Sequence, residues 1–474
     1  MLFNSLEFIV FLTVVYGLYL SLQHRAQNWM LLVASYVFYG WWDWRFLGLI
    51  AFTTVLDYWV SLKVAAADNQ REKRLFLSVS VVCNLGLLAA FKYFNFFAQS
   101  LVDLAAGLGF QLDWTTLNII LPVGISFITF QSIAYSIDVY RGHLAPPRRI
   151  SDFALFVAFF PQLVAGPIQR ATNLLPQVVE PRQVTLDRVT RGGFLILYGL
   201  FKKMVIADGL ATGVNAVYNS SSGISGIDVA LATYLFVFQM YCDFSGYTDI
   251  ARGVSKLMGF NLSKNFMTPF YASSPSEYWT RWHISLSSWV KDYVYMPLAL
   301  HYLRKGDSKL NEYRPHVYAM VLMGLWHGAA WTYVLWGVYH GFMLIAWDAI
   351  KWPKPIRRFR KHIPQAFWIL VYFHVTAISL LIFRASSVGQ IGQLFDALGE
   401  GLSPSNLTMP KPPAATLLAL PLLLILDYLA FRHASDLYYR KWPDAARGGL
   451  VAVLLVLVLM GWSNAPAEFI YFQF

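Results

Sequence analysis

Charged residues are scarce in this chain. Lys, Arg, Asp and Glu make up 13% of the 474 residues, whereas apolar residues make up 57% and aromatic residues 17%. A soluble domain contains about 25% charged residues, so a water-soluble protein of this length needs more charge to cover its surface. The composition therefore argues against an ordinary soluble protein and predicts that much of the surface contacts lipid.

Cysteine is nearly absent, and the motifs of several large enzyme classes are missing. Cys83 and Cys242 both lie in apolar surroundings and show no metal-binding spacing, so we expect neither a disulfide nor a metal site. The chain has no Walker A loop, no strand-borne GxGxxG, no GxSxG elbow and no HExxH motif. These absences argue against P-loop and dinucleotide enzymes, serine hydrolases and zinc proteases, and we expect no bound cofactor.

The net charge of +11 is distributed in short clusters between the apolar segments. A nucleic-acid-binding protein concentrates such charge in one stripe or patch. The observed distribution is typical of the cytoplasmic loops of a membrane protein. We therefore expect membrane lipid, and no nucleic acid, as a partner.

About twelve apolar segments reach or approach the roughly 20 residues that a transmembrane helix needs. They lie near residues 6–22, 29–44, 47–65, 75–95, 118–139, 193–217, 229–247, 317–331, 333–350, 364–383, 413–431 and 449–464. The apolar stretch 153–168 is short, contains Pro161 and Pro167, and has basic flanks, so we interpret it as a re-entrant segment. We predict an all-α polytopic protein with a single membrane domain, 1–474, of about eleven or twelve transmembrane helices.

Lys and Arg residues indicate how these segments are oriented. If the N-terminus is outside, the inside loops carry 30 Lys and Arg residues and the outside segments carry three. The inside loops are 23–28, 66–74, 141–150, 170–191, 249–316, 351–362 and 432–447, and the outside residues are Arg45, Arg384 and Lys411. Because cytoplasmic loops are enriched in Lys and Arg, we predict that both termini are outside, which for a bacterial inner membrane means the periplasm.

The long polar loop 249–316 is rich in Trp and Tyr and is predicted to lie on the membrane surface. Within it, the segment Ser274–Glu277 matches a capping box with Pro at the first helical position. The pattern predicts a helix that begins at Glu277-Tyr278-Trp279 and carries Arg281-Trp282-His283.

Ionisable side chains at membrane depth are the strongest indications of function, because each costs about 2.5–3.5 kcal/mol on insertion scales. His327 lies in the apolar string Met323–Trp331, next to Trp326, and small residues follow it. An imidazole away from water is neutral and can accept a proton, which suits a general base. From this residue alone, a structural histidine bonded to a neighbouring helix carbonyl is an equally good interpretation.

Two further histidines favour structural roles when each is taken alone. His283 lies beside Arg281 near the predicted inside interface, where histidines are more often structural than catalytic. His340, in Tyr339-His340-Gly341, repeats the pattern of Trp326-His327-Gly328 thirteen residues later. The two histidines would lie on different faces of one straight helix, so we expect a turn between them and a structural role for His340.

Two acidic residues, Asp243 and Asp249, lie at a predicted helix end. They could cap that helix, pair with Arg281 or line a substrate path, and the residues alone favour a structural role. Lys202, Lys203 and Asp208 lie within an apolar segment. We expect them to form an internal ion pair or to extend toward the inside interface.

Seven strings along the chain form an ordered set of motifs. They are Leu121–Phe127, Tyr135–Gly142, Phe159–Pro167, Phe201–Met204, Tyr241–Asp249, Arg281–Ser285 and Leu325–Gly328. Any one of them is weak, but the ordered set is specific and extends over essentially the whole chain. It resembles the membrane-bound O-acyltransferase family, and most closely the bacterial branch that acetylates alginate.

The resemblance implies roles for the residues at the matching positions. His327 matches the intramembrane catalytic histidine of the family, and His283 matches its second, upstream signature position. The residues expected to line the substrate path or to support the site are Asp243, Asp249, Arg281 and Trp326. The resemblance also implies a central tunnel that joins the two membrane faces, with the acyl group entering from the cytoplasm and leaving as an ester outside.

We therefore expect a membrane O-acyltransferase that moves an acetyl group across the inner membrane for O-acetylation of an exopolysaccharide such as alginate. The expected donor is a cytosolic thioester, either acetyl-CoA or an acyl-carrier protein, and the expected partner is a periplasmic acetyltransferase. Two alternatives remain open. One is D-alanyl transfer to teichoic acid, and the other is a non-catalytic scaffold or channel for polysaccharide export.

Overall fold

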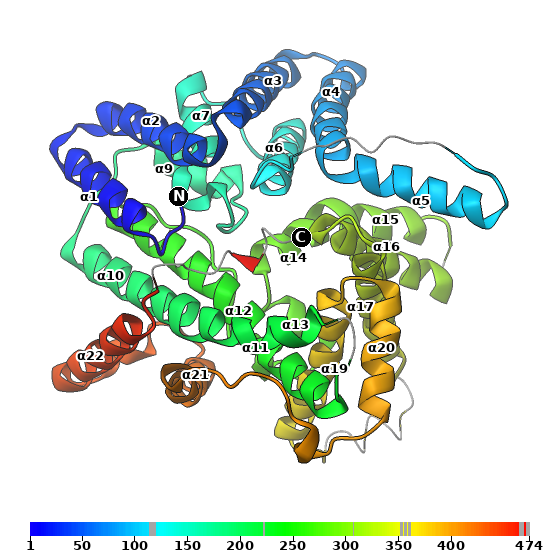
Figure 1. Ribbon diagram of the computed structural model, residues 1–474. Coiled ribbons are helices and arrows are strands. Elements are labelled where there is room, and N and C mark those ends of the chain that lie inside the picture. The colour runs from blue at the N-terminus through cyan, green and yellow to red at the C-terminus, as the bar shows by residue number, and fades with distance from the viewer. Residues whose placement is uncertain are drawn as a thin grey trace. The chain divides into compact units, whose positions relative to one another are not determined.

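The protein is built from helices. The computed structural model describes residues 1–112, 120–220, 223–306, 308–350, 354, 358, 362–463 and 469–470. The chain is 77% helical (Figure 1). Its described residues form no strand. The predicted all-α class is confirmed.

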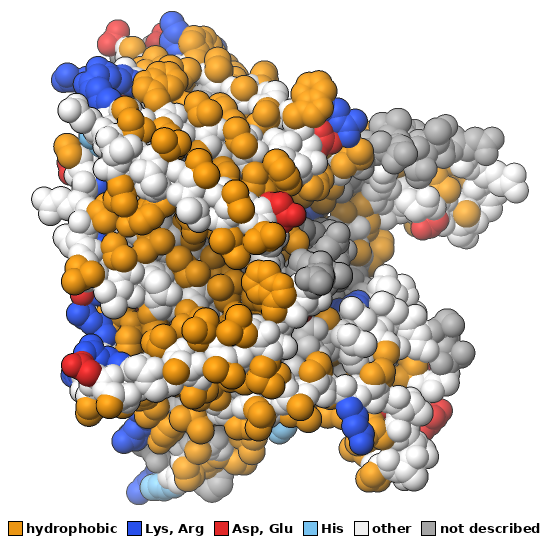
Figure 2. Space-filling view, turned by 60° about the vertical axis from the view of Figure 1, so that its left-hand side comes forward, with side chains coloured by type: hydrophobic (Ala, Val, Ile, Leu, Met, Phe, Trp, Pro, Cys, Tyr) orange, Lys and Arg blue, Asp and Glu red, His pale blue; other side chains and the backbone are white. Residues whose placement is uncertain are grey.

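Five helical stretches of the described chain are long and apolar enough to cross a membrane. They are His24–Ala66, Gln70–Gly107, Gly226–Leu257, Gln365–Arg384 and Ala414–Arg432. Large hydrophobic side chains such as Trp29, Val33 and Leu424 point outward from these stretches, and Figure 2 shows one face on which hydrophobic side chains are widespread. Such a surface is stable only against lipid, so the protein is a multi-pass membrane protein.

The chain forms two compact units. Unit 1 comprises Met1–Gly193 and Ala251–Ser263, and unit 2 comprises Phe194–Ile250 and Lys264–Phe474. Each is described by itself below.

Unit 1 contains the N-terminal helices. They are α1 (Leu6–Ser21), α2 (His24–Asp43), the short helix η1 (Trp44–Phe46), α3 (Leu47–Ala66), α4 (Gln70–Leu88), the π-helix η2 (Ala89–Tyr93), α5 (Phe94–Gly107), α6 (Ile125–Tyr140), α7 (Ile150–Ala158), α8 (Phe160–Leu163) and α9 (Ala171–Val179). Helices α3, α4 and α6 pack against one another, and α2 packs against α7 and α8. The core of unit 1 therefore lies where these helices meet.

Two predicted segments of unit 1 can be compared with the structure. The segment predicted as 118–139 becomes helical only at Ile125, and its first two residues lie outside the described chain. Gly124 has a φ of 77°, and a Cβ there would meet the carbonyl oxygen of Leu163, so a turn precedes the helix. The segment interpreted as re-entrant forms α7 and α8, which break at Phe159 and are each too short to span a membrane.

Unit 2 contains the remaining helices, and α10 and α12 begin or end in unit 1. They are α10 (Leu186–Leu200), the π-helix η3 (Phe201–Ala207), α11 (Asp208–Tyr218), α12 (Gly226–Leu257), η4 (Pro269–Tyr271), α13 (Pro275–Trp279), α14 (Ile284–Val290), the π-helix η5 (Lys291–Tyr295), α15 (Met296–Leu303), α16 (Lys309–His327), α17 (Trp331–Ile350), α19 (Gln365–Arg384), α20 (Val388–Gly399), η6 (Pro404–Asn406), α21 (Ala414–Arg432), η7 (Tyr438–Lys441) and α22 (Asp444–Met460).

The predicted helix end near Asp243 and Asp249 is wrong. Helix α12 continues without a break to Leu257, ten residues beyond the predicted boundary at 247. The predicted turn between His327 and His340 is confirmed, because α16 ends at His327 and α17 begins at Trp331. Figure 1 shows α16 and α17 side by side, and they pack along their lengths.

Candidate active site

His327 is the last residue of α16. Gly328 follows it in extended conformation and ends the helix. The side chain is 4% exposed. The rings of Trp326, Trp336 and Phe383 surround the imidazole, with centroids at 5.0, 5.1 and 5.3 Å. The predicted candidate base is therefore buried among aromatic rings at a helix end.

Glycines allow α16 and α17 to approach closely beside this histidine. A Cβ at Gly324 would meet the carbonyl oxygen of Tyr333, and a Cβ at Gly337 would meet that of Met320. Small residues at facing positions let two helix backbones pack in contact, as is common in membrane proteins. This contact fixes the position of Trp336, the neighbour of Gly337, against the His327 ring.

His283 lies in a tight turn directly before α14. Its φ of 42° and ψ of 52° are left-handed, a conformation uncommon for a residue with a side chain. Asn265 holds the turn, because its backbone oxygen accepts from the Ile284 N–H at 2.9 Å and its Oδ1 accepts from the Ser285 N–H at 3.2 Å. Such conformations persist where surrounding contacts enforce them, and they occur often at functional sites.

The structure brings the two candidate histidines together. The ring centroids of His283 and His327 are 6.3 Å apart, and the rings are tilted by 47°. Phe244 packs edge-on against His283 at 4.6 Å, and Trp326 lies 5.7 Å from it. His283 is 1% exposed, and burial lowers its pKa to about 3, so it is neutral near pH 7. Two buried imidazoles in an aromatic setting can accept, hold and hand over a proton.

Arg281 supports the segment that leads into His283. Its guanidinium pairs with Glu277 at 2.9 Å and donates to the carbonyl oxygen of Met267 at 3.2 Å and to Thr268 Oγ1 at 3.1 Å. Burial opposes ionisation of Glu277, but hydrogen bonds from Ser273 and the charge of Arg281 hold its pKa below the ordinary value. Arg281 thus ties residues 267–281 into one rigid loop.

The capping prediction at Ser274 is confirmed, and its extension is wrong. Ser274 Oγ accepts from the Glu277 N–H at 3.2 Å, and α13 begins at Pro275. The helix ends at Trp279, however, so Arg281-Trp282-His283 does not lie on it. The left-handed turn at His283 is incompatible with a continuous helix.

Asp243 and Asp249 lie inside α12 and pair with lysines of η3, not with Arg281. Asp243 Oδ1 is 2.7 Å from Lys203 Nζ, and Asp249 Oδ2 is 2.5 Å from Lys202 Nζ. Asp243 Oδ2 also accepts from the backbone N–H of Ile470 at 2.7 Å. The expected internal ion pairs of the two lysines are confirmed, and the suggested pairing with Arg281 is not observed.

These ion pairs position one side of the candidate site. Phe244, the residue after Asp243, carries the ring that packs against His283. The π-helix η3 widens one turn of its helix and places Lys202 and Lys203 toward α12. Phe244 and Asn265 were not among the predicted site residues. Phe244 stands within the Tyr241–Asp249 string, whereas no sequence signal identifies Asn265.

Comparison with known proteins identifies the family. The sequence model of the MBOAT, membrane-bound O-acyltransferase family, matches residues 147–386, which include both histidines. A protein of Azotobacter vinelandii named "Probable alginate O-acetylase AlgI" is 39% identical over 84% of this chain and 78% of its own length. The chain belongs to the membrane-bound O-acyltransferase family.

Two more distant members of the family differ in the reaction that their names state. A peptidoglycan O-acetyltransferase of Helicobacter pylori is 31% identical over 100% of this chain and 98% of its own length. A teichoic acid D-alanyltransferase of Streptococcus thermophilus is 31% identical over 55% of this chain and 68% of its own length. The protein is an O-acyltransferase, with His283 and His327 inside the matched region.

A third histidine of this O-acyltransferase, His340, lies behind the pair. It is 1% exposed and contacts Trp336 at 4.6 Å and Trp279 at 5.0 Å, and it stacks with Tyr278 at 6.3 Å. Trp336 contacts both His327 and His340 and separates the two imidazoles. The structural role expected for His340 stays a prediction.

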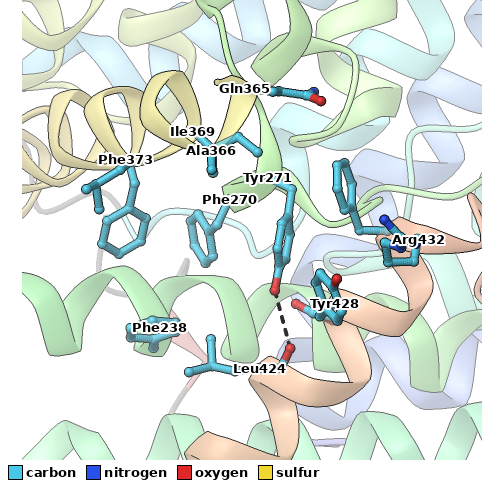
Figure 3. Close-up of a pocket in the computed structure, with 13 residues that line it drawn as sticks. Phe238, Phe270, Tyr271, Gln365, Ala366, Ile369, Phe373, Leu424, Tyr428 and Arg432 are labelled. Atoms are coloured by element: carbon cyan, nitrogen blue, oxygen red, sulfur yellow. Dashed lines mark hydrogen bonds between the residues drawn. The ribbon is translucent and has the colours of Figure 1, made fainter. Parts of the chain in front are cut away.

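A cavity of about 620 Å³ lies between α12, η4, α19 and α21 of this membrane-bound O-acyltransferase (Figure 3). Six of its thirteen lining residues are aromatic, and Tyr271 donates across it to the carbonyl oxygen of Leu424 at 3.3 Å. Phe270 lines the cavity, and its ring lies 6.3 Å from that of Trp282, the residue before His283.

Proposed function

We propose that the protein transfers an acetyl group from a cytosolic thioester across the bacterial inner membrane for O-acetylation of an exopolysaccharide such as alginate. The observation that carries this proposal is the buried pair His327 and His283, with ring centroids 6.3 Å apart, in an O-acyltransferase. The name of the Azotobacter vinelandii relative supports the acetyl group and the polymer.

His327 acts as the general base in this proposal. It accepts the proton of the acceptor hydroxyl while the hydroxyl oxygen attacks the thioester carbonyl carbon. The C–S bond then breaks, the acetyl group becomes an ester, and the proton on His327 passes to the leaving thiolate. General-base assistance contributes typically ~10²–10⁴-fold, and positioning of the two substrates supplies much of the rest.

His283 orients the donor or the acceptor, or assists the proton transfer. Its pKa of about 3 keeps it neutral across the physiological range, so it can donate one hydrogen bond and accept another without carrying charge. The rings of Phe244 and Trp326 exclude water from its surroundings. A dry site protects the thioester from hydrolysis and strengthens each polar contact.

The donor, partner and location complete the proposal. The donor is acetyl-CoA or an acetylated acyl-carrier protein, and no cofactor stays bound through the cycle. A periplasmic acetyltransferase receives the acetyl group or acts with this protein on the polymer. Both termini lie in the periplasm, as the 30 to 3 distribution of Lys and Arg supports.

D-alanyl transfer to teichoic acid is the second candidate. The Streptococcus thermophilus relative supports it, but that similarity covers 55% of this chain. The relative named as a peptidoglycan O-acetyltransferase covers 100%. The extent of similarity therefore favours acetyl transfer.

A donor assay with purified protein in nanodiscs distinguishes these candidates. Radiolabelled acetyl-CoA, an acetylated carrier protein and a D-alanylated carrier protein are each supplied with alginate oligosaccharide or lipoteichoic acid. We expect thiol release and ester formation in equal amounts with an acetyl donor and the alginate acceptor. Turnover with the D-alanyl donor alone would replace the proposal by the second candidate.

A further inference from the structure

A second buried polar cluster lies in unit 1, in helices that contribute nothing to the histidine pair. Asp57 stands in the middle of α3 and is 0% exposed, although α3 belongs to a membrane-spanning stretch. An ionisable residue at such depth is costly and is retained mainly where it has a function.

Side chains of α4 and α6 converge on the Asp57 carboxylate. Ser80 Oγ donates to Oδ1 at 2.6 Å, and Asn84 Nδ2 donates to Oδ1 and Oδ2 at 3.0 and 3.2 Å. Ser136 Oγ lies 2.9 Å from Ser80 Oγ, and the hydroxyl of Ser132, also on α6, is buried without a hydrogen-bond partner among the described residues. Three helices thus surround one carboxylate with neutral polar groups.

The negative charge has no positive partner among the described residues. No Lys, Arg or His of the described chain lies within ion-pair distance of Asp57, and only neutral side chains interact with it. A buried charge without a partner is strongly unfavourable. Either a proton or a cation must therefore compensate it.

The hydrogen bonds favour a cation over a proton. Both carboxylate oxygens accept hydrogen bonds, which stabilises the charged form of the group. Burial opposes this charge, so the charged form needs a compensating ligand. The contacts around Asp57 are therefore those of a carboxylate that keeps its charge.

Further oxygens around Asp57 have lone pairs available for a ligand. Thr54 Oγ1 and Asn84 Oδ1 are buried and have no hydrogen-bond partner among the described residues. Thr54 lies one turn before Asp57, on the same face of α3. A buried oxygen left unsatisfied is rare and indicates an ion or a water molecule at the site.

We propose that the Asp57 cluster binds one Na⁺ ion. The candidate ligands are all oxygens, which suits a hard cation, and the cluster contains no sulfur or imidazole for a transition metal. The single carboxylate balances a monovalent charge. The bound ion ties α3, α4 and α6 together, so it acts on the stability of unit 1.

Thermal unfolding in sodium-free buffer tests this proposal. The purified protein is titrated with NaCl, KCl or LiCl while choline chloride holds the ionic strength constant. We expect a saturable rise in melting temperature with NaCl, and a smaller rise with KCl at the same concentration. At a free Na⁺ concentration ten times the dissociation constant, the ratio of folded to unfolded protein should increase about 11-fold. The stoichiometry of ²²Na⁺ binding should be one ion per chain.

Asp57→Asn should abolish the response to NaCl, because it removes the charge and preserves the shape. Asp138→Asn is the matched control, since Asp138 is a buried aspartate of the same unit, on α6, near His143. It should keep the full response. Thr54→Val removes one ligand oxygen at nearly constant volume, and the half-saturating NaCl concentration should rise several-fold. If Asp57→Asn does not fold, Thr54→Val still tests the proposal.

Three results would overturn the proposal. One is a melting temperature of the unaltered protein that depends on ionic strength alone. Another is an undiminished NaCl response in Asp57→Asn or in Thr54→Val. The third is a higher melting temperature of Asp57→Asn that does not depend on Na⁺ and that increases further as the pH rises. This result would show that a proton occupies the site.

Discussion

His283 is an unusual residue because it combines a left-handed backbone conformation with almost complete burial. His283 combines φ 42° with 1% exposure, and each property has an energetic cost. Asn265 and the rings of Phe244 and Trp326 hold it in this state. The protein thereby presents a neutral imidazole to His327, and this property can be tested through pH.

Acid should destabilise the protein through His283. Its pKa is about 3 in the folded state and about 6.5 when unfolded, so its contribution is fully present above pH ~6.5 and falls as the pH drops toward 3. The free energy of unfolding should decrease by up to about 1.4 kcal/mol per pH unit in this window. Melting temperatures at pH 7.5, 6.5 and 5.5 provide the measurement.

The variant His283→Gln supplies the comparison, because Gln is neutral at every pH in this range. Its melting temperature should fall less between pH 6.5 and 5.5 than that of the unaltered protein. Identical pH dependence in the two proteins would show that His283 is not buried as a neutral group.

Asp243→Asn should lower the yield of folded protein more than the activity of each folded molecule. The change removes one of two carboxylates that neutralise Lys203, and Asp208 remains at 2.8 Å. Breaking a buried pair costs about 3–5 kcal/mol when no partner remains, so we expect a smaller loss here. The measurements are the yield of folded protein and the rate of acyl transfer per molecule of monodisperse protein.

An exposed acidic residue serves as the control for this variant. Asp444 pairs with Arg447 at the surface, and Asp444→Asn should change neither yield nor activity. Full folded yield of Asp243→Asn with no activity would place Asp243 in the catalytic set.

At the scale of elements, α16 and α17 determine where His327 lies. Their contact through Gly324 and Gly337 leaves no room for a side chain. Gly337→Ala should therefore separate the helices, displace Trp336 from His327, and lower both melting temperature and activity. Gly392→Ala in α20 is the control, because a Cβ there meets no atom within 4 Å. It should be neutral or stabilise the protein by about 0.5–1 kcal/mol.

One result would contradict this account of the two helices. If Gly337→Ala and Gly392→Ala have the same melting temperature and the same turnover, the close helix contact does not position His327. Circular dichroism melts and single-substrate turnover of both variants decide the question.

The sequence predicted the elements that depend on hydrophobic length and missed those that depend on tertiary contacts. Apolar runs identified most helices, and the capping signal at Ser274 placed the start of α13. The continuation of α12 past Asp243 was missed because Lys202 and Lys203 neutralise its acidic residues from another helix. The turn at His283 depends on Asn265, which is 18 residues away in the chain. Neither contact leaves a local pattern.

The prediction that His283 and His327 belong to one site had a different basis. Residue type alone favoured a structural role for His283, and only the resemblance to a family joined it with His327. The 6.3 Å between their rings follows from the end of α16 and the turn between α13 and α14, which no periodicity predicts. Asp57 shows the same limit, because its partners Ser80 and Ser136 come from two other helices.

At the scale of the whole molecule, the distribution of Lys and Arg predicts the orientation in the membrane. Reporter fusions after residues 220–222 and at the C-terminus should be active as periplasmic alkaline phosphatase. Fusions within residues 354–361 should be active only as cytoplasmic reporters. Most of these positions lie outside the described residues, so the prediction depends on the charge distribution alone. A cytoplasmic signal from the C-terminus would contradict it.

The central claim is that His327 is the catalytic base, and one measurement tests it most directly. Acyl transfer is measured with purified, monodisperse His327→Ala protein, a thioester donor and a supplied acceptor. We expect an unchanged elution profile, a melting temperature close to that of the unaltered protein, and turnover lower by at least ~10²-fold. His283→Ala should lose as much or less, and His340→Ala should keep most activity. Turnover of His327→Ala near that of the unaltered protein would contradict the account.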